Sequence, residues 1–228
     1  MWVIGILGGI ASGKSQVTRM LAELGCGVLD ADRAGHEVLR QSEVKQMLRD
    51  RWGDAVFDEQ GQVDRQSVAR IVFGDGSNKS ANTNSTKPNP SETHLPTEPN
   101  FNPDAERAFL EQVTHGRIGE LLGKQAEEFA ATGQVKAIVL DAALLLEAGW
   151  DRMCDALVFV AAPRPDRLRR AMARGWTESE FDAREGAQET LEAKRQQADF
   201  EIDNSGDLEH LRGQVERFWR TFSAANPA

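Results

Sequence analysis

The sequence predicts an α/β fold in which one parallel sheet is flanked by helices. Short apolar runs rich in Val, Ile and Leu alternate along the chain with longer segments whose apolar residues fall at helical spacing. The first apolar run also leads into a glycine-rich turn and a helix, "GILGGIASGKSQV" starting at Gly5. This order is typical of a strand–loop–helix unit, and 228 residues suit one domain with subdomains.

Five apolar runs are expected to form the strands. They are short, and each ends in a turn residue or a carboxylate, as buried strands of a parallel sheet do. The two cysteines, Cys26 and Cys154, lie far apart in these and neighbouring segments, without the spacing of a metal site. The expected strands lie at residues 2–7, 27–32, 136–141, 155–163 and 199–206.

The segments between the strands are expected to be helical. The first shows the pattern clearly, because Val17, Met20, Leu21 and Leu24 recur at helical spacing after Lys14. A later stretch is composed almost entirely of Ser, Thr, Asn, Pro and Gly, has little to bury, and is predicted to be a flexible insertion at about 75–103. The expected helices lie at 14–24, 33–53, 64–74, 105–133, 164–175, 177–198 and 207–222, with Gly116 and Gly119 as points where the fourth could bend.

Composition excludes several classes of protein. The formal net charge of −9 argues against a general nucleic-acid or anionic-membrane binder, and no protein partner is evident. Two widely separated cysteines fit a reduced, cytoplasmic protein. The start of the chain lacks the basic region and long apolar core of a signal peptide, and no apolar run approaches the length of a membrane span. We therefore expect a cytoplasmic protein that is not a general binder of nucleic acids or anionic membranes.

Residues Gly8 to Ser15 spell G-x-x-x-x-G-K-S, a motif that binds nucleoside triphosphates. Its glycines let backbone N–H groups point at phosphate oxygens, and the following helix adds the positive end of its dipole. Lys14 would reach the β- and γ-phosphates, and the Ser15 hydroxyl would ligate Mg²⁺. The alternative is an ordinary glycine-rich turn. The motif leaves ATPase, GTPase, kinase and regulator open.

Carboxylates at two strand ends could select among these reactions. Asp30 and Asp32 end the second expected strand, beside the phosphate loop, where a kinase needs a carboxylate to orient an acceptor hydroxyl and take its proton. The competing interpretation makes Asp32 the N-cap of the next helix. Asp141 follows "AIVL" and could hold a Mg²⁺-bound water or form a turn.

A basic stripe could stabilise the transferred phosphate. Arg167, Arg170 and Arg174 are spaced to share one helical face, and Arg184 and Lys194 on the next charged segment could complete a closing lid. The alternative is a solvated helix face with its cations near the C-terminal end of the dipole.

Together these residues resemble the dephospho-coenzyme A kinase family. The resemblance runs nearly end to end, through "GGIASGKS", "VLDAD", "VDRQSVARIVF", "LLLEAGWDRMCDALVFV", "RLRRAMARG", "AQETLEAKRQQAD" and "IDNSG". It implies ATP-dependent phosphorylation of the ribose 3′-hydroxyl of dephospho-CoA, the last step of coenzyme A synthesis, with Mg²⁺. It also implies a P-loop NTPase fold with a core at about 1–31, 134–165 and 199–228, a helical substrate-binding region at about 32–133, and a lid at about 166–198.

The resemblance also implies roles for individual residues. Asp32 would be the base at the 3′-hydroxyl, and Arg170 and Arg174 would contact phosphate or adenine from the lid, with Arg170 and Lys14 assisting catalysis. Three residues would fall in the dephospho-CoA region: Arg65, His115 and Glu147. The ATP-binding loop would comprise Gly8, Gly9, Ala11, Ser12, Gly13, Lys14, Ser15 and Gln16.

The chain departs from the family pattern at several positions. Ala11 replaces a usual glycine, which is tolerable if its φ is negative, and Gln16 replaces a small residue. The family's His-Pro pair reads His115-Gly116, and Ala143 replaces a proline. Two other functions stay open beside the favoured one: another small-molecule kinase acting on a nucleotide or sugar, and a nucleotide-binding regulator without turnover.

Overall fold

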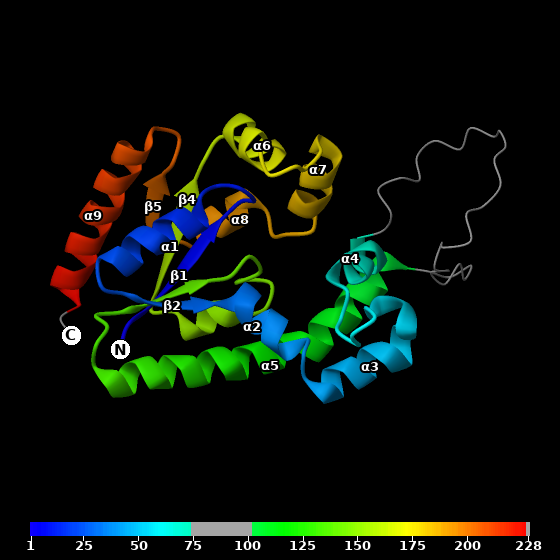
Figure 1. Cartoon of the computed structure of the whole chain (residues 1–228). Helices are drawn as coiled ribbons and strands as arrows, with labels where there is room; N and C mark the ends of the chain where they lie inside the picture. The colour runs from blue at the N-terminus through cyan, green and yellow to red at the C-terminus, as the bar shows by residue number, and fades with distance from the viewer. Residues whose placement is uncertain (74–101, 227–228) are drawn as a thin grey trace. The chain divides into compact units, whose positions relative to one another are not determined.

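The computed structural model describes residues 1–73 and 102–226 (Figure 1). Contacts divide the chain into two compact units, one formed by Met1–Ala34 with Ile118–Ala228, the other by Gly35–Arg117. The predicted insertion at 75–103 lies almost entirely outside the described residues. Within the described residues, every strand of the sheet belongs to the first unit.

A five-stranded parallel sheet forms the centre of the first unit, as the sequence predicted. The strand order is β2-β3-β1-β4-β5, and all four neighbouring pairs are parallel. Because β1 lies in the middle, the turn at its carboxyl end is flanked by the carboxyl ends of β3 and β4. The strands are β1 (Val3–Gly8), β2 (Gly27–Asp30), β3 (Ile138–Asp141), β4 (Ala156–Ala161) and β5 (Phe200–Asp203).

Helices connect the strands, and two segments predicted as single helices are each divided in two. Segment 33–53 belongs to α2 and α3, and segment 177–198 forms α7 and α8. Thr177 and Thr190 both act as N-caps, since their hydroxyls accept hydrogen bonds from N–H groups three residues on, and Thr190 thereby starts a separate helix. The helices are α1 (Lys14–Glu23), α2 (Ala31–Val38), α3 (Ser42–Trp52), α4 (Arg65–Phe73), α5 (Pro103–Thr132), α6 (Arg164–Met172), α7 (Glu178–Gly186), α8 (Leu191–Gln196) and α9 (Leu208–Ala225), with 3₁₀ turns at Asp54–Val56 and Trp150–Met153.

The main hydrophobic core lies between the sheet and helices α1 and α9, which cover the same face (Figure 1). Val17, Met20 and Leu21 of α1 are buried there, as their spacing predicted. From α9, Phe218 and Phe222 pack with ring centroids 5.6 Å apart. Alternate strand residues complete the core, because side chains alternate between the two faces of a sheet; they are Ile4, Ile6, Val139, Val158, Val160 and Ile202.

The second unit is helical and is held by an aromatic and an ionic contact. Trp52 at the end of α3 packs edge-on against Phe109 of α5, with ring centroids 5.5 Å apart. Glu106 of α5 accepts two hydrogen bonds from Arg51, at 3.0 and 2.8 Å, and one from the Trp52 indole at 2.7 Å. These contacts hold the pKa of Glu106 below its usual value, so the carboxylate stays ionised and continues to accept all three hydrogen bonds.

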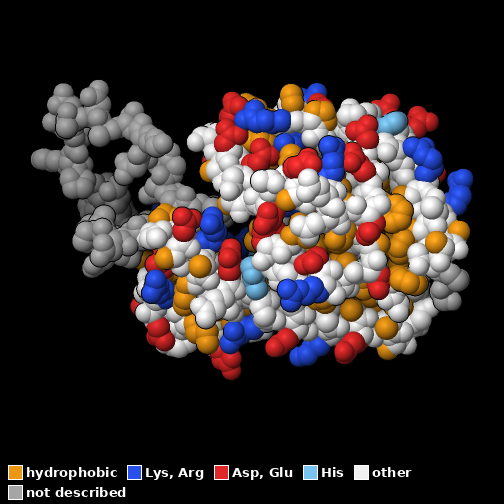
Figure 2. All heavy atoms as spheres, turned by 180° about the vertical axis from the view of Figure 1, so that it is seen from behind, with side chains coloured by type: hydrophobic (Ala, Val, Ile, Leu, Met, Phe, Trp, Pro, Cys, Tyr) orange, Lys and Arg blue, Asp and Glu red, His pale blue; other side chains and the backbone are white. Residues whose placement is uncertain are grey.

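Charged groups of both signs are interspersed on the face shown in Figure 2, without a continuous basic surface. Within residues 1–73 and 102–226, no helix is both long enough and apolar enough to span a bilayer.

Candidate active site

The glycine-rich turn joins β1 to α1 and is closed by a hydrogen bond from the Ser12 N–H to the Gly9 carbonyl at 3.1 Å. Gly13 precedes α1 in a left-handed conformation, with φ of 105°. A Cβ atom at Gly13 would overlap the side-chain amide of Asn204. Both the backbone conformation and this close approach therefore require glycine at position 13.

Lys14, the first residue of α1, directs its ammonium back over the turn. Its Nζ donates hydrogen bonds to the carbonyls of Gly8 at 3.0 Å and Gly9 at 3.2 Å. Burial lowers the pKa of Lys14 from 10.5 to about 8, although the carboxylates of Asp141 and Asp32 act in the opposite direction. The side chain is therefore a cation at neutral pH that would be stabilised further by an anionic ligand.

Asp141 ends β3 and lies beside the start of α1. Its register pairs it with Ile6 of β1 and with Asp30 of β2, so it stands at the carboxyl edge of the sheet. Thr18 Oγ1 donates to Asp141 Oδ2 at 3.3 Å, and Ser15 also hydrogen-bonds the carboxylate. The pKa of Asp141 is raised above its usual value because burial outweighs the opposing effects of Lys14 and these two donors. A hydroxyl beside a carboxylate is an oxygen donor set that suits Mg²⁺.

Asp30 and Asp32 of the motif "VLDAD" differ in their contacts, and this shows which of them caps the following helix. The carboxylate of Asp30 accepts a hydrogen bond from the Arg33 N–H at 2.9 Å, the pattern of an N-cap. The capping role proposed for Asp32 thus belongs to Asp30. Asp32 lies exposed in the first turn of α2, near enough to Lys14 for its charge to raise that group's pKa.

Ala11 adopts a left-handed backbone conformation, with φ of 56°. The condition under which alanine would be tolerated here without strain, a negative φ, is therefore not met. The methyl group is nonetheless buried, because it packs in a small cluster with Ile10, Ala171 and Phe181. Side-chain packing against α6 and α7 thus offsets part of the backbone strain.

Arg170 and Asn204 fasten the turn from outside. The Arg170 guanidinium donates to the carbonyl of Ser12 at 3.1 Å and to the carbonyl of Asn204 at 2.9 Å. Asn204, directly after β5, donates from its side-chain amide to the Ser12 carbonyl at 2.7 Å. These contacts hold the backbone that would surround a phosphate, so Arg170 positions the loop.

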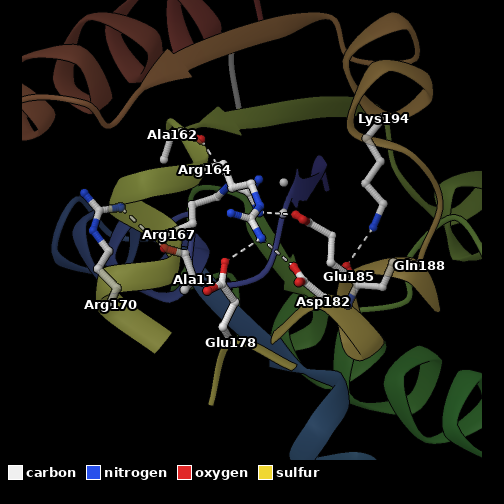
Figure 3. A network of polar contacts seen from close by, with 12 residues as sticks. Ala11, Ala162, Arg164, Arg167, Arg170, Glu178, Asp182, Glu185, Gln188 and Lys194 are labelled. Carbon is white, nitrogen blue, oxygen red and sulfur yellow. Dashed lines mark hydrogen bonds and ion pairs between the residues drawn. The ribbon is translucent and has the colours of Figure 1, made fainter. Parts of the chain in front are cut away.

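The predicted arginine stripe is only partly continuous. Arg167 and Arg170 lie on α6, but the helix ends at Met172, so Arg174 lies beyond it and is exposed. Arg167 is buried, contacts Glu185, and donates to the Ala162 carbonyl at 3.1 Å (Figure 3). Its role is therefore to tie α6 to α7, since its charge is already compensated within the protein.

Glu147, six residues beyond β3, faces helix α8. Its Oε1 accepts from the Glu189 N–H at 2.7 Å and lies 3.2 Å from Nζ of Lys194. The Lys194 side chain is 2% exposed and also donates to Gln188 at 3.1 Å (Figure 3). The carboxylate predicted to contact substrate thus forms a buried ion pair with the lid-side helix.

The two remaining predicted residues belong to the second unit. Arg65 begins α4, and its guanidinium contacts the ring of His36. His115 lies half-buried within α5. The first unit thus gathers Lys14, Asp141 and Asp32, whose charges all act on one another, while Arg65 and His115 are placed on separate helices of the second unit.

The sequence missed two residues of this site. Asn204 ends the motif "IDNSG", and its position directly after a strand could have indicated a contact at the carboxyl edge of the sheet. Lys194 was assigned only to a general lid. No spacing rule reveals that its ammonium is buried beside Glu147, because the two residues are far apart in sequence.

Similarity to known proteins identifies the family of this chain. A model of the dephospho-CoA kinase family matches residues 2–94 and 94–210. The chain belongs to the dephospho-CoA kinase family. The dephospho-CoA kinase of Symbiobacterium thermophilum is 36% identical over 222 residues, covering 96% of this chain and 81% of that protein. That of Carboxydothermus hydrogenoformans is 34% identical over 215 residues, with coverage of 93% and 90%.

The fold is also that of known P-loop kinases. The structure of dephospho-CoA kinase from Campylobacter jejuni superposes with a TM-score of 0.64 at 20% identity, covering 98% of both chains. Membership of the dephospho-CoA kinase family identifies the chain as a kinase with a nucleotide-binding P-loop. The resemblance drawn from the sequence motifs is thereby confirmed.

Proposed function

We propose that the chain transfers the γ-phosphoryl group of ATP to the ribose 3′-hydroxyl of dephospho-CoA, which completes coenzyme A synthesis. The observation that carries this proposal is the gathering of Lys14, Asp141 and Asp32 at the carboxyl ends of neighbouring strands. A cation for phosphate, oxygen ligands for a divalent metal and a carboxylate for an acceptor are the three groups that phosphoryl transfer to a hydroxyl needs.

In this proposal ATP binds along residues 8–15. The N-terminal end of α1 and the backbone N–H groups of the turn bind phosphate oxygens, and Lys14 neutralises the β- and γ-phosphates. Because the pKa of Lys14 is about 8 without a ligand, most of the population is already charged at pH 7. A bound phosphate favours the protonated form still more.

Mg²⁺ fits beside the same turn. Ser15 and Asp141 would hold it, the hydroxyl directly and the carboxylate directly or through water, since both present oxygen to the same place. The ion supplies charge neutralisation across the β- and γ-phosphates. Thr18 fixes the orientation of the Asp141 carboxylate through its hydrogen bond.

Asp32 would orient the 3′-hydroxyl and accept its proton as the hydroxyl oxygen attacks the γ-phosphorus and ADP leaves. Its support is its place in the first turn of α2, close to Lys14, while Asp30 already serves as the cap. Arg170 would keep the loop in shape, and the exposed Arg174 would contact phosphate or adenine. Three residues stay proposed contacts of dephospho-CoA: Arg65, His115 and Glu147.

The test is acceptor-dependent ADP formation with ATP and Mg²⁺. Dephospho-CoA, AMP and gluconate are compared as acceptors for the wild type, Asp32→Asn and Asp207→Asn. Asp207 caps α9 through the His210 N–H at 2.8 Å, and asparagine caps equally well, so this variant makes the same chemical change away from the site.

We expect turnover with dephospho-CoA alone, a loss of about 10²-fold or more in Asp32→Asn, and wild-type turnover in Asp207→Asn. Turnover with AMP or gluconate instead would keep the kinase and discard this substrate. Nucleotide binding without turnover on any acceptor would point to a regulator. Full activity in Asp32→Asn would remove that carboxylate from the mechanism.

A further inference from the structure

We infer that Lys194 is a second phosphate-binding lysine of the nucleotide site, which contacts the γ-phosphate of ATP, and that Glu147 is its counter-ion within the protein. This inference rests on the proposed use of ATP at residues 8–15. It goes beyond that proposal because it assigns a ligand to a residue of α8 that lies outside the nucleotide-binding motif.

Helix α8 packs directly on the phosphate loop. A Cβ atom built at Gly9 would stand 2.9 Å from Cδ2 of Leu191 and 2.8 Å from Nη1 of Arg167. Lys194 follows Leu191 by three residues, so both side chains project from the same face of the helix. The lid-side helices thus approach the loop closely at Gly9, and Lys194 lies on the same face of α8 as the residue that makes this approach.

Lys194 is buried but incompletely paired. An ammonium group has three protons to donate, and within the described residues it has two oxygen partners, Gln188 at 3.1 Å and Glu147 at 3.2 Å. The second carboxylate oxygen of Glu147 is also buried and has no hydrogen-bond partner among them. Buried charges are costly unless fully paired, so the third proton of the Lys194 ammonium favours one more acceptor, whereas Oε2 of Glu147 would need a donor.

The two lysine ammonium groups are close enough to repel. Lys194 lowers the pKa of Lys14, while the carboxylates that act on Lys14 are Asp141, Asp32 and Glu147. Lys194 therefore lies within electrostatic range of Lys14, the lysine that would bind the β- and γ-phosphates. An anionic phosphoryl group between the two lysines would remove their repulsion and supply the missing acceptor.

The competing role is purely structural: the Glu147–Lys194 pair would only fasten α8 to the segment after β3. The two roles differ in one measurable respect. A structural pair supports the whole loop and affects ATP and ADP alike, whereas a ligand of the γ-phosphate distinguishes them. Comparing ADP with a non-hydrolysable ATP analogue therefore separates the roles without relying on turnover.

The experiment measures dissociation constants of ADP and AMP-PNP with Mg²⁺ by titration calorimetry. The variants are Lys194→Met, Lys194→Arg and Lys124→Met, the last removing an exposed lysine of α5. We expect Lys194→Met to weaken AMP-PNP binding by about 10-fold or more and ADP binding by less than about 3-fold. Lys194→Arg should recover part of the loss, and Lys124→Met should match the wild type.

Glu147→Gln covers the case in which Lys194→Met fails to fold. It keeps the lysine and removes its counter-ion, so we expect AMP-PNP binding that is unchanged or tighter. Equal weakening of ADP and AMP-PNP in either variant, or no weakening in Lys194→Met, would overturn the inference. Wild-type protein that binds neither nucleotide would overturn the proposed function itself, and the inference with it.

Discussion

Replacing Lys14 with methionine should stabilise the ligand-free protein while abolishing its activity. Burial lowers the pKa of Lys14 from 10.5 to about 8, which at about 1.4 kcal/mol per pH unit corresponds to roughly 3 kcal/mol against the charged form at pH 7. Methionine is similar in length and uncharged. It loses the hydrogen bonds to Gly8 and Gly9, worth about 1 kcal/mol net. The expected net gain is about 2 kcal/mol.

The stability gained by Lys14→Met should also depend on pH, in a direction set by the lowered pKa of Lys14. Between pH 8 and 10.5 the unfolded chain holds the Lys14 proton more tightly than the folded chain, so wild-type stability gains from this group as pH rises through that window. Below pH 8 Lys14 is charged in the folded chain, so the full destabilisation from burying this charge is present. The advantage of Lys14→Met should therefore be largest near pH 7 and shrink towards pH 10.

Thermal denaturation without nucleotide measures the effect. For a chain of this size, about 2 kcal/mol corresponds to a rise in Tm of about 4–8 °C. Lys124→Met is the matched control and should leave Tm unchanged, because that side chain is exposed. A Tm of Lys14→Met at or below the wild-type value at pH 7, or a difference in Tm that widens at higher pH, would show that the buried ammonium does not destabilise the folded chain.

Two further predictions concern backbone conformation, and both are read by the same denaturation assay. Ala11→Gly relieves a left-handed alanine, worth about 1–2 kcal/mol, and loses a buried methyl, worth about 0.8 kcal/mol, so stability should be equal or higher. The control Ala183→Gly, at an exposed site in α7, should lower the free energy of unfolding by about 1 kcal/mol. An equal loss of stability in both variants would contradict the strain inferred at Ala11. Gly13→Ala should cost about 2 kcal/mol or more, because its Cβ meets Asn204 at a positive φ. Gly123→Ala, within α5 and with open space around it, should instead gain about 0.5–1 kcal/mol, and similar changes at both glycines would show that the contact with Asn204 is relieved without cost.

Much of the fold was predictable because it depends on neighbours in sequence. The five strands and the α1 face formed by Val17, Met20 and Leu21 follow from local periodicity, which burial then satisfies. The phosphate loop was equally predictable, since its function resides in consecutive backbone groups. Helix ends were less so: Thr190 divides a predicted helix by capping, a local competition that apolar spacing does not reveal.

The chemistry at the strand ends needed the structure. Asp30 and Asp32 are indistinguishable by position, and only the hydrogen bond to the Arg33 N–H identifies Asp30 as the cap. The φ of Ala11 is 56°, and its methyl group lies in a buried cluster with Phe181 of the distant helix α7, which no local pattern indicates. Arg167 and Arg170 appeared equivalent on one stripe, yet one is an internal tie and the other holds the loop.

Short spacings and side-chain chemistry were enough to predict the strand–loop–helix unit, the lysine at position 14 and the carboxylates after two strands. Which charged groups meet depends on tertiary packing. Lys194 and Glu147 are 47 positions apart in the printed sequence, and Asn204 is further still from Ser12. Their pairing depends on how α8 and β5 pack against the loop, and packing across such separations is encoded by no local pattern.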